Sequence, residues 1–121
     1  MYGYHTSNTL IPQLLDRPIW FALERDTALH GWSLTSTGQS FFYQASLHRV
    51  AIKKLDNLTN DVLTSNPTAE QVLALPMIQQ LSKLGYAGLM LADYDPRDED
   101  RDLFSVCMFD PLKGVSGWTR F

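Results

Sequence analysis

Short apolar runs, each about the length of one β-strand, recur along the chain. The first is at residues 19–22, where Pro18 precedes four apolar side chains. In residues 41–47 every odd position is apolar, and two of the three even positions are polar. This two-residue period is typical of a strand with one buried face. We therefore predict strands over both segments, and we expect Val50 and Ile52 to extend the second one after a bend.

The middle of the chain carries the pattern of a helix. Thr68 is followed three residues later by Gln71, which is the spacing of a capping box at a helix N-terminus. Apolar residues then recur at intervals of three or four, namely Leu73, Met77, Leu81 and Leu84. Because Pro76 removes an amide donor and clashes with the preceding turn, it is expected to divide the segment into two helices or to kink one. Gly85 is the expected C-cap.

The remaining elements mix strands and helices. Residues 88–92 and 104–109 are apolar and predict two more strands, which the acidic stretch 93–102 separates as an expected loop. A short helix is predicted over residues 24–32. Since the elements do not alternate regularly and no linker or repeat divides the chain, the sequence predicts a single α+β domain over residues 1–121.

Composition and charge exclude several classes of protein. The chain has 121 residues, of which 45% are hydrophobic, enough for a core of its own. A net charge of -3 leaves no basic surface for DNA or RNA. No apolar run approaches ~18 residues and no signal segment is present, so we expect a cytoplasmic protein without a membrane span. The only cysteine, Cys107, lies in an apolar strand, where burial is expected to raise its pKa and leave it a structural role.

Two segments near the N-terminus resemble a known family. The motif Tyr4-His5-Thr6-Ser7, followed by the aromatic strand at residues 20–22, resembles the opening of ADP-ribosyltransferases, in which the first strand contacts NAD+. The order of the later elements is similar to that of small phage-encoded transferases of the anti-CRISPR type. This resemblance spans nearly the whole chain. It implies split antiparallel β-sheets flanked by short helices.

The resemblance also implies NAD+ as co-substrate and a set of site residues. Contact with the nicotinamide and its ribose is expected from the motif Tyr4-His5-Thr6-Ser7, and a flat face for the ring from the aromatic residues Phe21, Trp32 and Tyr43. An acidic residue is expected at the end of the strand that begins at Gly88, which here is Asp93, with Asp95 and Asp102 as further candidates. An ionised carboxylate suits this role, because positive charge develops on the ribose as nicotinamide leaves. His5 and Asp93 are thus the expected catalytic residues.

The resemblance leaves three functions open. The first is an NAD+-dependent mono-ADP-ribosyltransferase that modifies a protein, with a subunit of a bacterial defence (CRISPR) complex as the suggested target. The second is an NAD glycohydrolase, in which water replaces the acceptor. The third is a non-catalytic inhibitor or binding protein that keeps the fold. Its support is the position at the start of the last predicted strand, where many relatives carry Glu and this chain has Phe104 or Ser105.

Each assignment has a structural alternative. Phe21 and Tyr43 can be core residues, since large aromatic side chains dominate burial in a small domain. His5 can be a surface residue, and the acidic stretch 93–102 can be a solvated loop. The three histidines have no pairing at metal-ligand spacing, and we expect no metal site.

Overall fold

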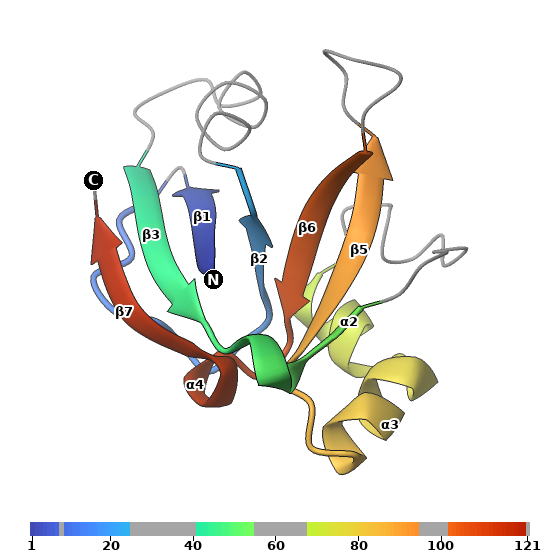
Figure 1. The fold of residues 1–121 in the computed structure, drawn as a ribbon. Coiled ribbons are helices and arrows are strands. Elements are labelled where there is room, and N and C mark those ends of the chain that lie inside the picture. Colours follow the sequence, from blue (N-terminus) through green and yellow to red (C-terminus); the bar gives the residue numbers. More distant parts are fainter. Residues whose placement is uncertain (8, 25–40, 55–67, 95–101, 121) are drawn as a thin grey trace.

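Seven strands form one mixed sheet in the computed structural model, which describes residues 1–7, 9–24, 41–54, 68–94 and 102–120. The strands are β1 Tyr2–Ser7, β2 Ile19–Ala22, β3 Phe41–Leu47, β4 Ile52–Lys54, β5 Gly88–Tyr94, β6 Asp102–Met108 and β7 Val115–Arg120. Their order across the sheet is β4-β5-β6-β2-β1-β3-β7. Every described neighbouring pair is antiparallel except β4 and β5 (Figure 1).

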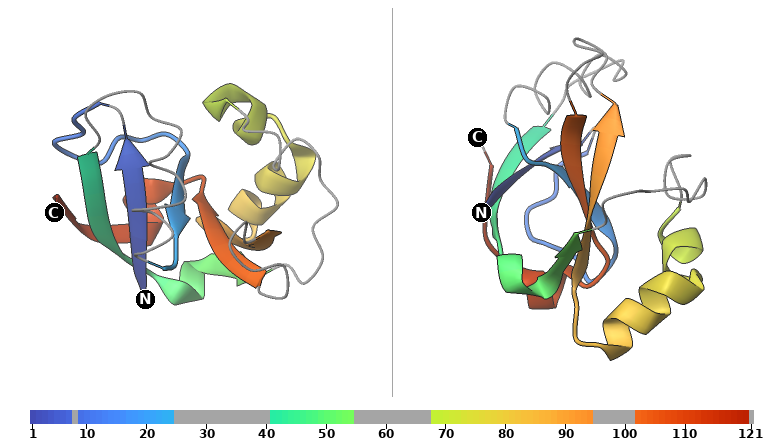
Figure 2. Two further views of the ribbon diagram at one scale, coloured as in Figure 1. Left: turned by 90° about the horizontal axis from the view of Figure 1, so that it is seen from above. Right: turned by 45° about the vertical axis from the view of Figure 1, so that its right-hand side comes forward.

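The sheet curls, and its weakest junction is between β1 and β2. These two strands are in register at a single pair, Tyr4 with Ala22. By contrast, β1 and β3 pair over six residues, and β5 and β6 over seven. Seen from above, β1 and β3 lie on one side of β2, while β6 lies on the other (Figure 2). The sheet therefore has two well-paired parts, β4-β5-β6-β2 and β1-β3-β7, that meet at one residue pair.

Local sequence signals set the helix boundaries. The helices are α2 Ala69–Leu73, α3 Pro76–Lys83, α4 Pro111–Gly114 and the 3-10 turn η3 Arg49–Ala51. The predicted capping box is confirmed, because the Gln71 amide donates to Thr68 Oγ1 at 3.2 Å and the Thr68 amide donates to Gln71 Oε1 at 2.8 Å. Pro76 begins α3 and so divides the helical segment in two. Gly85 follows the end of α3 with a φ of 94°, a left-handed conformation that favours glycine.

The two faces of the sheet carry separate apolar clusters. Helices α2 and α3 cover one face beside β5 (Figure 2). The buried residues there are Val72, Ile78, Leu81, Leu89, Leu91, Cys107 and Phe109. The other face lies inside the curl, where the buried residues are Phe21, Ala45, Leu47, Ala87, Val106, Met108 and Val115. Cys107 is buried, and burial raises the pKa of its thiol to about 12, as expected for a cysteine in an apolar strand.

Most of the predicted elements are confirmed. The strands at residues 19–22 and 41–47 have the predicted bounds, and the α+β class is correct. The acidic stretch is less of a loop than expected, because β5 continues to Tyr94 and β6 begins at Asp102. The helix predicted over residues 24–32 lies, apart from Glu24, outside the described residues.

Two expectations were wrong. Val50 and Ile52 do not extend β3, because Val50 lies in η3 and Ile52 begins β4, which pairs in parallel with β5. This parallel pair also departs from the expected all-antiparallel sheets. Beyond residue 109 the sequence indicated no further element, whereas the structure has α4 and the edge strand β7.

Gly3 on β1 lies too close to its neighbours to carry a side chain without movement of the strand. Gly3 is buried, and a Cβ there would lie 2.7 Å from Leu47 Cδ1 and 2.9 Å from Phe21 Cβ. We expect Gly3→Ala to lower the free energy of unfolding by about 1–3 kcal/mol, because β1 must move away from the core. Denaturant titration measures this change. Ser116→Ala on the exposed side of β7 is the control, with an expected change below about 0.5 kcal/mol. An unchanged midpoint for Gly3→Ala would contradict the packing described.

Candidate functional site

His5 lies on β1, next to the junction with β2, and its ring is fixed by one hydrogen bond. Nδ1 is 2.6 Å from the Trp20 carbonyl oxygen. Because a carbonyl only accepts, Nδ1 must carry the proton, and Nε2 of the neutral ring keeps its lone pair. Burial lowers the pKa of His5, and the hydrogen bond to Trp20 opposes this shift only in part. His5 is therefore a neutral side chain near pH 7 whose Nε2 can accept a hydrogen bond.

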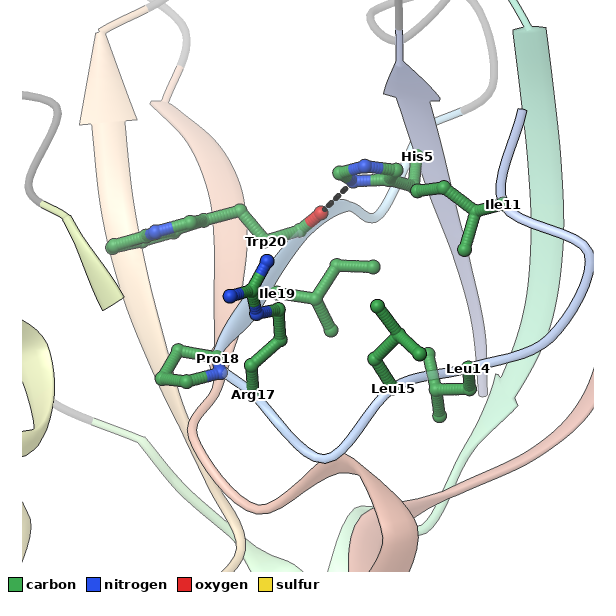
Figure 3. A pocket seen from close by; sticks show the side chains of 8 residues that line it. All are labelled: His5, Ile11, Leu14, Leu15, Arg17, Pro18, Ile19 and Trp20. Carbon is green, nitrogen blue, oxygen red and sulfur yellow. Dashed lines mark hydrogen bonds between the residues drawn. The ribbon is translucent and has the colours of Figure 1, made fainter. Parts of the chain in front are cut away.

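A pocket of about 200 Å³ adjoins the His5 ring (Figure 3). Its wall combines β1, the start of β2 and the segment that connects them; the lining residues are His5, Ile11, Leu14, Leu15, Arg17, Pro18, Ile19 and Trp20. Apolar side chains predominate. A cavity of roughly 150 Å³ is enough for benzene, whereas drug-sized ligands occupy at least ~300 Å³. The pocket therefore has room for one aromatic ring and not for a whole dinucleotide.

The segment between β1 and β2 is held over the inner face of the sheet at Ile11. The Ile11 amide donates to the Tyr43 hydroxyl at 2.7 Å, and Trp118 Nε1 donates to the Ile11 carbonyl at 3.0 Å. The rings of Tyr43 and Trp118 stack with their centroids 4.5 Å apart and an interplanar angle of 13°. Strands β3 and β7 thus set the position of a pocket wall that neither of them lines.

Three aromatic rings surround His5. The ring centroids of Phe21, Trp118 and Tyr43 lie 6.1, 6.2 and 6.4 Å from that of His5. Phe21 is 0% exposed and Tyr43 is 1% exposed, so neither presents a face to a ligand in this arrangement. Both are core residues, as the structural alternative predicted, and both pack against the His5 ring. Trp118 was missed by the sequence analysis, because nothing near it in the chain connects it with Ile11.

The other motif residues divide between the two faces of β1. Successive residues of a strand point to opposite faces, so His5 and Ser7 share one face, and Tyr4 and Thr6 the other. Ser7 Oγ accepts from the Thr9 amide at 3.2 Å, which shapes the turn that leaves β1. Of the four motif residues, only His5 lines the pocket. Trp32, the third predicted ring, lies outside the described residues.

The structure does not bring Asp93 beside His5. Strands β2 and β6 lie between β1 and β5. His5 shares a face with Phe21. Phe21 pairs with Val106, and Val106 pairs with Met90, so Met90 belongs to the same face as His5. Asp93 is three residues beyond Met90 on β5. An odd separation along a strand changes the face. The backbone positions of His5 and Asp93 therefore belong to opposite faces. Asp102 pairs with Tyr94 at the same end of the sheet, and Asp95 lies outside the described residues.

Within the described ranges, no group of three or more His, Cys, Asp or Glu residues is placed to hold a metal ion. None of the helices in those ranges is long and apolar enough to cross a membrane. In comparisons with family models, curated proteins and solved structures, no match to this chain is found.

Burial of neutral His5 predicts a pH dependence of stability. The unfolded chain binds a proton at His5 below about pH 6.5, while the folded chain does so only at lower pH, so the unfolded state holds more protons in this window. The free energy of unfolding should therefore fall as the pH decreases from about 6.5 towards the lowered pKa. We expect His5→Gln to remove this contribution in denaturant titrations at pH 5 to 7. The exposed residue His48 supplies the control His48→Gln, which should keep it. Equal slopes for wild type and His5→Gln would contradict the assignment.

The bond at Ile11 predicts a change in hydrogen exchange. Tyr43→Phe removes the acceptor of the Ile11 amide while keeping the stacked ring. One net hydrogen bond is worth about 1 kcal/mol, so the Ile11 amide should exchange about fivefold faster in this variant. Amide exchange followed by NMR gives the rate. Tyr86→Phe, which removes a hydroxyl at a half-buried position beside α3, serves as the control and should leave the rate unchanged. The same Ile11 rate in Tyr43→Phe would show that the bond does not hold the segment.

Proposed function

We propose that the protein is an NAD+-dependent mono-ADP-ribosyltransferase that modifies a protein and binds the nicotinamide end of NAD+ at the His5 pocket. The observation that carries the proposal is a neutral histidine, fixed through Nδ1, beside an apolar pocket with room for one ring. The nicotinamide ring would fill the pocket. A hydroxyl of its ribose would donate to Nε2, which has no hydrogen-bond partner among the described residues.

The shape of the sheet supports the same function. The resemblance at residues 4–7 and 20–22 implies two β-sheets that are split at the cleft for NAD+. Here the two well-paired parts of the curled sheet meet at Tyr4 and Ala22, and the His5 pocket lies beside that junction. An ADP-ribosyltransferase-like fold is therefore part of the proposal.

Transfer of ADP-ribose requires a carboxylate in addition to His5. As the bond between nicotinamide and ribose breaks, positive charge develops on the ribose and a carboxylate stabilises it. The resemblance gives this role to Asp93, with Asp95 and Asp102 as the further candidates. Because the backbone of Asp93 belongs to the face opposite His5, the role of Asp93 rests on the resemblance alone. Nicotinamide leaves with the electron pair of the broken bond, and the acceptor on the target protein forms the new bond to the ribose and gives up its proton to solvent. If water takes the acceptor's place, the same site acts as an NAD glycohydrolase.

A second candidate function is favoured by the position of Asp93. Its backbone lies two strands away from β1 and on the other face from His5. A protein that keeps the pocket without a carboxylate beside it would bind its ligand and not turn it over. The second candidate is accordingly a non-catalytic binding protein that inhibits a partner by covering part of its surface.

Calorimetric titration with NAD+ tests the binding step. Wild type should bind NAD+, and His5→Gln should bind it about five- to tenfold more weakly, because one hydrogen bond and its geometry are lost. His48→Gln is the matched control and should bind like wild type. No heat of binding with wild type, or equal affinities for wild type and His5→Gln, would remove NAD+ from this pocket.

Incubation with labelled NAD+ and a bacterial lysate tests the transfer step. Label on protein supports the transferase, free ADP-ribose indicates the glycohydrolase, and binding without either product indicates the non-catalytic protein. If Asp93 stabilises the developing charge, Asp93→Asn should lower turnover by roughly 10²-fold with the fold retained. Turnover near the wild-type value would exclude Asp93 from the mechanism.

A further inference from the structure

Arg17 is the only cationic side chain among the residues that line the His5 pocket. It lies in the segment that leads into β2, directly before Pro18, and it is exposed to solvent. Two local features fix its backbone: the Arg17 amide donates to the Leu15 carbonyl at 2.9 Å, and the ring of Pro18 restricts the chain that follows. The side chain extends along β2 in the direction of Ile19 (Figure 3). A turn therefore presents the guanidinium at the edge of the apolar pocket.

The guanidinium of Arg17 has no ion-pair partner within the part of the chain that the structure describes. Asp16 is next to it in sequence but does not line the pocket. A guanidinium carries five donors in a planar fork that matches two oxygens of a phosphate or carboxylate. An unpaired guanidinium at the edge of an apolar pocket thus provides a place for an anionic group of the ligand.

The remaining lining limits which ligand can use this place. Apart from His5 and Arg17, the pocket is lined by apolar residues and by Trp20. A ligand that fills the pocket and reaches Arg17 is flat and apolar at one end and carries an anion a short distance away. In NAD+ the nicotinamide ring, its ribose and the first phosphate follow one another in this order. The pocket of about 200 Å³ accepts the ring alone, so the ribose and phosphate must lie towards the edge.

We propose that Arg17 binds the phosphate attached to the nicotinamide ribose, so that the pocket recognises the nicotinamide mononucleotide half of the cofactor. This inference rests on the proposed function, because it assumes that nicotinamide occupies the pocket. Arg17 is then a specificity residue: it distinguishes phosphorylated nicotinamide compounds from the riboside and from free nicotinamide.

Calorimetric titration of four compounds tests this assignment: nicotinamide, nicotinamide riboside, nicotinamide mononucleotide and NAD+. Wild type should bind the mononucleotide at least about tenfold more tightly than the riboside, since a charge-assisted hydrogen bond to phosphate is among the strong ones. Arg17→Gln should remove this preference by weakening binding of the mononucleotide, and Arg17→Lys should restore part of it. Arg49→Gln, a loss of the same charge in η3, is the matched control and should keep the preference. The preference of wild type should also decrease at high salt.

The outcomes separate this inference from the proposed function. If NAD+ binds in a His5-dependent manner and Arg17→Gln keeps the phosphate preference, the inference is overturned and the proposed function stands. If the mononucleotide binds through Arg17 but labelled NAD+ yields no transferred ADP-ribose, the inference stands and the transferase is overturned. If neither phosphorylated compound binds to wild type, both are overturned.

Discussion

The hydrogen bond from His5 Nδ1 to the Trp20 carbonyl is the interaction on which the rest of the site depends. It connects β1 with β2 at the junction where the two parts of the sheet share one registered pair. It also fixes the tautomer, since a donor at Nδ1 leaves Nε2 as an acceptor. Packing against Phe21 and Trp118 restrains the same ring. This bond thereby fixes the position and the tautomer of the ring, while burial keeps the ring neutral.

Local signals predicted much of the fold, and long-range pairing explains what they missed. The capping box at Thr68 and the glycine after α3 act within a few residues, so the sequence shows them directly. Strand β4 has three residues and exists because it pairs with β5, a neighbour that its own sequence does not reveal. The alternation of β7 is interrupted at Gly117, whose φ is 63°, and its pairing with β3 shifts register. An irregular edge strand of this kind has no clear two-residue period.

Only the part of the candidate site that is contiguous in sequence could be predicted. The motif at residues 4–7 identified His5, and the two-residue period of a strand already implies that Tyr4 and His5 belong to different faces. Contacts between distant residues were out of reach, because Ile11 and Trp118 are 107 residues apart. The expected partnership of His5 and Asp93 required both residues to face the same ligand. Strand order is a property of the whole fold, and it places β2 and β6 between them.

The central claim is that neutral His5 offers Nε2 to a ligand in the adjoining pocket. Long-range ¹H–¹⁵N NMR of the imidazole groups tests it most directly, with His5→Gln assigning the resonances. We expect a proton on Nδ1 and a lone pair on Nε2 in the free protein near pH 7, and a shift of the Nε2 resonance when NAD+ is added. A proton on Nε2 in the free protein, or a His5 spectrum that NAD+ at saturating concentration leaves unchanged, would contradict it.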